Sequence, residues 1–126
     1  METIRVLRIE PGEAPEDIKI AASTERYQQE VDGYIECVYP WDDDVCIMCN
    51  EEGKINGLPF NRSLKDEGGE VYDVIAGTFL IIGTTETGDS FRSLTDAEAQ
   101  KYKELFKYPE IIISIGRKIQ AYPVKV

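Results

Sequence analysis

Alternating apolar and polar positions in the first part of the chain predict two antiparallel strand pairs. Residues 3–9 and 17–21 each alternate apolar with charged positions, and Pro11 followed by glycine separates them. This pattern predicts a hairpin of two half-buried strands. Residues 34–39 and 45–49 are rich in strand-forming side chains and flank a turn of proline and aspartates. They predict a second antiparallel pair.

The remaining apolar runs predict a buried strand and a C-terminal hairpin. Residues 77–83 are continuously apolar, which is typical of a central strand covered on both faces. Residues 111–124 predict a hairpin in which Gly116 begins a type II′ turn. Between these elements, residues 54–70 contain many helix and strand breakers, so we expect a long irregular loop there. We expect a helical turn at 71–75.

Two segments carry helix signals. Ser23 is a good N-cap for a helix at 24–32, because its hydroxyl can accept a bond from an early backbone N–H. Thr95 and Glu98 form a capping-box pattern at the start of a second helix, at 96–107. Together these elements predict a single α+β domain, with an antiparallel or mixed sheet of about five to seven strands and two α-helices.

The charge is strongly negative and unevenly distributed. The net charge of the 126 residues is −10. Residues 1–91 contain 20 acidic and 7 basic residues, a net charge of −13, whereas residues 92–126 have a net charge of +3. Direct binding to a nucleic-acid backbone needs clustered lysines and arginines, so this class is excluded. The charge favours solubility, or an acidic face that docks a basic protein or imitates DNA.

Several features that the sequence lacks bear on the compartment of the protein and on catalysis. The sequence contains neither a signal-peptide pattern nor an apolar run long enough to cross a bilayer, and its cysteine count of three is odd. We therefore expect a soluble cytoplasmic protein. The chain has no histidine, which removes the commonest general base. We expect neither catalysis nor a cofactor.

Two motifs resemble metal sites, and a structural role fits each of them better. Cys46 and Cys49 would point to opposite faces of a strand, and the chain offers too few further ligands for zinc. Asp42, Asp43 and Asp44 lack the alternating spacing of a calcium loop. We expect buried cysteines and a solvated acidic turn.

The segment around residues 56–62 carries the best candidates for ligand binding. Arginine can form two parallel hydrogen bonds with a phosphate or a carboxylate. The carboxamide of asparagine is a directional donor, and aromatic rings stack on planar ligands. The candidate ligand-binding residues are Trp41, Asn56, Phe60, Asn61, Arg62 and Arg92. The alternative is that both asparagines bond loop backbone while Phe60 packs into the core.

Three stretches resemble an uncharacterised family of small domains. They read YIECVYPWDDDVCIMCNEEGKINGLPFNR at 34–62, VYDVIAGTFLIIG at 71–83 and FRSLTDAEAQKYKELFKYPE at 91–110. The resemblance extends over about residues 1–110 and leaves out the tail after Glu110. The family occurs in phages, prophages, plasmids and conjugative elements, mainly of Firmicutes. The resemblance implies an accessory protein of a mobile element, many of which act against host defence, and it implies no activity.

Two functions fit these observations. The first is a non-catalytic protein that binds and sequesters a small nucleotide-like immune signal, at the subunit interface of a homo-oligomer. The second is an acidic antirestriction-type inhibitor, which imitates DNA or docks onto a host DNA-binding protein through Asp42, Asp43 and Asp44. A metal-dependent hydrolase is a third and weaker alternative.

Overall fold

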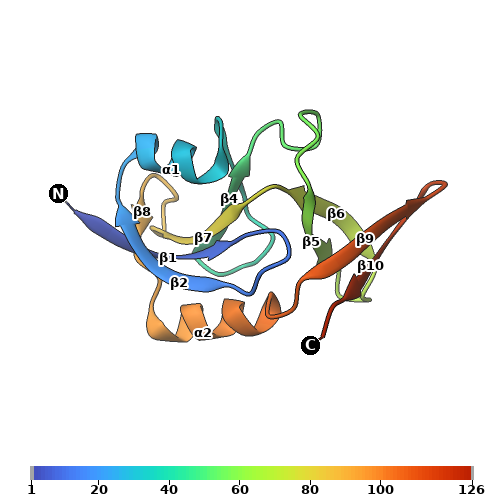
Figure 1. Ribbon diagram of the computed structural model, residues 1–126. Helices are drawn as coiled ribbons and strands as arrows, with labels where there is room; N and C mark the ends of the chain where they lie inside the picture. Colours follow the sequence, from blue (N-terminus) through green and yellow to red (C-terminus); the bar gives the residue numbers. More distant parts are fainter. Residues whose placement is uncertain (1, 126) are drawn as a thin grey trace.

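Residues 2–125, which the computed structural model describes, form two helices and ten strands (Figure 1). The helices are α1 (Thr24–Val31) and α2 (Asp96–Leu105). The strands are β1 (Thr3–Ile9), β2 (Glu16–Ala21), β3 (Ile35–Val38), β4 (Val45–Asn50), β5 (Phe60–Lys65), β6 (Val71–Ala76), β7 (Phe79–Thr84), β8 (Phe91–Arg92), β9 (Glu110–Ile115) and β10 (Lys118–Pro123). The α+β class expected from the sequence is confirmed.

The main sheet has the strand order β2-β1-β7-β4-β3, and β8 adds to one end of β7. All its pairings are antiparallel. Every residue of β4 and β7 is buried, so the apolar run near residues 77–83 is a central strand, as predicted. The expected pairs β1–β2 and β3–β4 are also confirmed. No helix in the described part of the chain has the length and apolar character that a membrane span requires.

The two helices cover opposite faces of this sheet (Figure 1). Because side chains alternate along a strand, each central strand contributes to both cores. Tyr27 of α1 packs on a cluster that includes Val6 and Leu80. Tyr102 of α2 packs on a second cluster that includes Leu7 and Ile81. The sheet is therefore a shared layer between two hydrophobic cores.

Both helices begin where the sequence predicts. The Ser23 hydroxyl accepts a hydrogen bond from the backbone N–H of Arg26. At α2, the Thr95 hydroxyl accepts from the Glu98 N–H, and the Glu98 carboxylate accepts from the Thr95 N–H, so the capping box is complete. Such a box satisfies backbone donors that helix geometry leaves free.

Residues 54–76 differ from the prediction. The segment expected to be an irregular loop contains β5, and the segment expected to be a helical turn is β6. These strands pair with each other as a separate two-stranded sheet, with register shifts on either side of Arg62–Leu64. The irregular pairing explains the absence of a simple alternation in the sequence.

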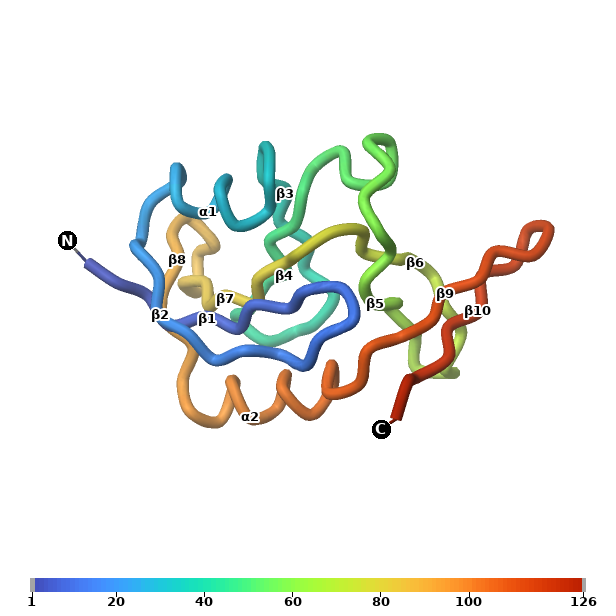
Figure 2. The backbone as a smooth tube through the Cα atoms, viewed as in Figure 1, coloured from blue at the N-terminus to red at the C-terminus, as the bar shows by residue number. Residues whose placement is uncertain are grey.

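The last two strands, β9 and β10, form a hairpin that extends away from the body (Figures 1 and 2). Gly116 has a φ of 62°, as the first central residue of a type II′ turn requires. The start of β9 lies against β5, and Val124 donates a backbone hydrogen bond of 2.7 Å to the Pro109 carbonyl.

Candidate functional site

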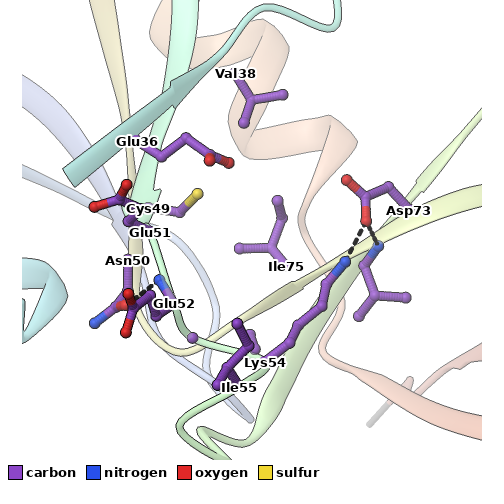
Figure 3. Close-up of a pocket in the computed structure, with 13 residues that line it drawn as sticks. Glu36, Val38, Cys49, Asn50, Glu51, Glu52, Lys54, Ile55, Asp73 and Ile75 are labelled. Atoms are coloured by element: carbon purple, nitrogen blue, oxygen red, sulfur yellow. Dashed lines mark hydrogen bonds and ion pairs between the residues drawn. The ribbon is translucent and has the colours of Figure 1, made fainter. Parts of the chain in front are cut away.

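A pocket of about 200 Å³ opens where the turn after β4 approaches β6 (Figure 3). Its apolar lining includes Val38, Cys49 and Ile75. Figure 3 shows the Glu36 carboxylate beside the Cys49 sulfur, and the Lys54–Asp73 ion pair beyond Ile75. The pocket therefore combines an apolar wall with carboxylates at its rim.

Asn50 holds the turn that forms one side of this pocket. Its buried side-chain amide donates hydrogen bonds of 3.0 Å to the carbonyls of Val31 and Asp32, at the end of α1. Its carboxamide oxygen accepts a 2.8 Å hydrogen bond from the Glu52 N–H. One side chain thus connects α1, β4 and the turn, which fixes the shape of the rim.

Gly53 allows the turn to lie directly on β6. A Cβ atom at this position would be 2.8 Å from the carbonyl oxygen of Ala76, closer than real side chains approach a backbone. In the sequence, Gly53 follows Asn50, Glu51 and Glu52, a run that is typical of a turn. The contact brings Lys54 within reach of Asp73.

The electrostatics of the pocket are negative. Glu36, Glu51, Glu52 and Asp73 line it together with one cation, Lys54. Burial, followed by the charge of Glu36, raises the pKa of the Cys49 thiol to about 12. At neutral pH the thiol is protonated, so it contributes apolar surface rather than a nucleophile. The arrangement suits a cationic group with an aliphatic stem.

The acidic corner between β3 and β4 contains one structural and two exposed aspartates. The Asp43 carboxylate accepts hydrogen bonds from Lys101 Nζ at 2.6 Å and from the Tyr102 hydroxyl at 2.7 Å, and both partners lower its pKa. Asp42 and Asp44 are exposed. Asp43 therefore attaches the corner to α2, whereas its two neighbours leave their carboxylates available to a partner.

Trp41 also belongs to this attachment. Its ring lies 4.5 Å from the Tyr102 ring and 6.1 Å from the Phe106 ring, measured between centroids. It is partly buried against the core under α2. The remaining exposed part of Trp41 lines a groove of about 760 Å³ between the acidic corner, the β5–β6 sheet and the end of α2, which we call the trough.

Asn61 and Arg62, predicted as ligand-binding residues, point into the protein. They are 1% and 0% exposed, respectively. Asn61 donates to the carbonyls of Ile9 and Gly77 at 2.8 and 2.9 Å. This position corrects the expectation that both side chains are presented to a ligand. For Asn61, the structure agrees with the alternative prediction, in which the side chain forms hydrogen bonds with the backbone.

Arg62 is held by acceptors from three segments. Its guanidinium donates to the carbonyl of Phe106 at 3.2 and 3.0 Å, to the carbonyl of Glu13 at 2.6 Å and to Asn61 Oδ1 at 2.9 Å. Burial lowers the pKa of Arg62, and the charge of Glu110 opposes this effect. The side chain joins β5 to the β1–β2 loop and to the end of α2, so it has a structural role.

The other predicted ligand-binding residues do not converge. Arg92 forms a two-point ion pair with Glu98, at 2.8 and 2.9 Å, and also donates to the Asp44 carbonyl. Asn56 and Phe60 are exposed, Phe60 at 45%. Both arginines are engaged in hydrogen bonds within the protein, Arg62 buried and Arg92 partly exposed. The nucleotide hypothesis therefore stays a prediction, without a free phosphate-binding group from this set.

The cysteines occupy the faces that strand geometry predicts. Cys46 packs in the cluster under α1, whereas Cys49 packs in the cluster under α2. Within residues 2–125, no three cysteine, aspartate or glutamate side chains lie close enough to share a metal ion. Glu36 and Asp73, which line the pocket, were not predicted from the sequence, because isolated acids in strands carry no motif.

Ion pairs leave a large excess of free carboxylates. Of the 24 acidic side chains, six take part in the ion pairs of residues 2–125. Of the 11 basic residues before residue 111, seven take part in these pairs and Arg62 is buried. Most cations of the body are therefore neutralised, and most anions are not.

Comparison with known proteins places the chain in a family. No curated protein and no solved structure matches it. Residues 4–107, which include both helices and strands β2 to β8, match the family described as "Domain of unknown function (DUF3846)". The match covers most of the 126 residues, and the chain belongs to this family.

Proposed function

We propose that this domain is a non-catalytic binding protein that captures a basic protein on its acidic surface. One observation carries the proposal: within the described residues, ion pairs neutralise most cations of the body and leave 18 carboxylates outside any ion pair. A field of this sign steers cationic partners and repels nucleic acid. The chemistry of the pocket adds an anchor point.

The pocket beside β6 suits the side chain of a lysine or arginine from the partner. Val38 and Ile75 would contact the aliphatic stem, and the carboxylate of Glu36 would receive the charged end. Glu36 has no ion-pair partner among residues 2–125, so a cation from outside would complete its interactions. Charge alone attracts a partner without fixing its orientation. A side chain held in the pocket would fix the orientation of the bound partner.

The biological setting is proposed from the sequence resemblance to domains of phages and other mobile elements. An accessory protein in that setting gains from blocking a host enzyme that binds DNA. Such enzymes present a basic surface that normally contacts phosphates. An acidic domain of the antirestriction type would occupy that surface, and the exposed carboxylates of Asp42 and Asp44 lie together in the corner between β3 and β4, which suits this contact.

The test is capture by purified host restriction and nucleoid proteins, measured by titration calorimetry at two salt concentrations. We expect binding to at least one of them, with affinity falling about tenfold or more between 50 and 200 mM salt. The double variant Asp42→Asn, Asp44→Asn should weaken capture while keeping the fold. Its matched control is Glu25→Gln with Glu86→Gln, which removes the same charge from exposed positions elsewhere.

A second arm of the test examines the pocket. Glu36→Gln should weaken capture of the same partner while leaving the melting temperature unchanged, because Glu36 is exposed. Capture that does not depend on salt would contradict the charge-based proposal, and so would an equal effect of the test and control pairs. A thermal shift with cyclic or ADP-ribose-type nucleotides, in the absence of protein capture, would support the nucleotide hypothesis instead.

A further inference from the structure

The hairpin β9–β10 carries an apolar face that the body of the same chain leaves uncovered. Ile111, Ile113 and Ile115 are 56%, 41% and 64% exposed. In the antiparallel register they lie opposite Tyr122, Gln120 and Lys118, on one face of the ribbon. The hairpin lies beyond residues 4–107, the part that matches the family. It lies outside the matched region and presents isoleucines to solvent.

An exposed apolar ribbon with free edges is an association site unless something covers it. Among the described residues, β9 and β10 pair only with each other, so each retains one open edge. The Tyr122 hydroxyl donates to Gln120 Oε1 within the face. The face is therefore well suited to contact a partner surface that is largely apolar.

The base of the hairpin is fixed to the body. The Glu110 carboxylate accepts hydrogen bonds of 2.7 Å from both the N–H and the hydroxyl of Ser63. Glu110 also lines the trough, so each hairpin starts beside the trough of its own chain. Figure 2 shows the hairpin extending away from the body of the chain. A fixed base lowers the entropy cost of docking the hairpin elsewhere.

The charge of the hairpin segment is opposite to that of the trough, which makes the trough of a second copy a suitable partner for the hairpin. Residues 111–126 contain three basic residues and no acidic residue, whereas residues 1–110 have a net charge of −13. The trough is lined by five acidic and two basic side chains, together with apolar surface from Trp41, Tyr72 and Leu105. Hairpin and trough therefore match in both charge and apolar character. Two hairpins brought together would instead juxtapose like charges.

We propose that the hairpin of one copy docks into the trough of a second copy, and that the exchange is reciprocal. A twofold arrangement uses each hairpin and each trough once, so the assembly closes as a dimer. The isoleucine face lies on Trp41, Tyr72 and Leu105, and Arg117 and Lys118 approach the carboxylates of the trough rim. This inference concerns self-association. The trough contains Asp42, which the proposed capture of a host protein also uses, so a docked hairpin and a captured partner would compete for this residue.

Variants of exposed residues test the proposal without disturbing the fold. The first replaces the hairpin face, Ile113→Asp with Ile115→Asp. The second reverses charge in the trough, Asp42→Lys with Glu67→Lys. The control is Ile55→Asp, in the turn after β4, where the isoleucine is 84% exposed and lines the other pocket. Circular dichroism and melting temperature establish that each variant is folded.

Light scattering after gel filtration gives the mass of each species across a concentration series. We expect twice the 14.3 kDa chain mass for the parent and the control, and 14.3 kDa for each of the two variants. An equimolar mixture of the two variants retains one intact hairpin and one intact trough, so we expect it to form a heterodimer.

A parent protein that stays monomeric at high micromolar concentration would overturn the proposal. A trough variant that dimerises like the parent would show that hairpins pair with each other or dock elsewhere, which also refutes it. Failure of the mixed variants to associate would refute the hairpin-to-trough contact. Because host-protein capture is measured separately with the monomeric hairpin variant, either proposal can fail without the other.

Discussion

Replacing Arg62 distinguishes a structural from a ligand-binding role for this arginine. In Arg62→Met, the carbonyls of Glu13 and Phe106 and the Asn61 Oδ1 atom lose their donor. A buried acceptor without a partner costs about 1–3 kcal/mol. The variant no longer buries a charge, which offsets part of this cost. We therefore expect a loss of about 3 kcal/mol in the free energy of unfolding.

A loss of this size is a large part of the ~5–15 kcal/mol that stabilises a typical domain. With a urea m-value of about 2 kcal/mol per molar, the midpoint of unfolding should fall by about 1.5 M. Arg62→Lys should be at least as harmful, because a single ammonium cannot reproduce the guanidinium fork. If the role of this residue were to bind an anion, lysine would instead be a mild replacement.

The assay is urea unfolding followed by circular dichroism, with Arg117→Met as the matched control. Arg117 lies exposed at the tip of the hairpin, so its replacement should change stability by less than about 0.5 kcal/mol. If Arg62→Met also stays within about 0.5 kcal/mol of the parent, the hydrogen-bond argument is refuted.

Three further outcomes can be measured. Gly53→Ala should destabilise the protein by about 1–3 kcal/mol, because the new Cβ has no room, whereas Gly68→Ala in an open turn should be almost neutral; equal melting temperatures would contradict this. In the native protein, a thiol reagent should react quickly with one cysteine, the half-buried Cys37, and with all three after unfolding. The Arg5 guanidinium lowers the pKa of Asp17 from 3.8 to about 2, so its stabilising effect is present above pH 4 and is lost as the pH falls to about 2. Asp17→Asn should flatten the pH dependence of stability in that window, and an unchanged curve would show that this pair contributes nothing.

The sequence was sufficient for elements whose signals are local. The capping box at Thr95 and Glu98 and the cap at Ser23 locate both helix starts, because each involves residues that are three apart in the chain. The continuous apolar run near residues 77–83 indicates a central strand for a similar reason, since burial on both faces removes polar positions. Such features do not depend on distant partners.

The sequence was insufficient where partners lie far apart in the chain. β5 and β6 pair irregularly, so neither strand has a clear alternation, and many turn residues surround them. The burial of Arg62 could not be predicted from the sequence for the same reason. Its acceptors lie 49 and 44 residues away, at Glu13 and Phe106, and an exposed arginine would have the same sequence context. The interpretation of Asp43 was incomplete because its partner Lys101 is 58 residues distant.

Strand β7 lies between β1 and β4 in the sheet, with one helix on each face. This central position bears on how the protein unfolds locally. Amide protons in such a strand exchange with solvent only when both cores separate at once. The hairpin lies outside this layer, with most of its residues exposed, and can open at lower free energy. Deuterium uptake should therefore begin at the C-terminal ribbon and reach residues 79–84 last.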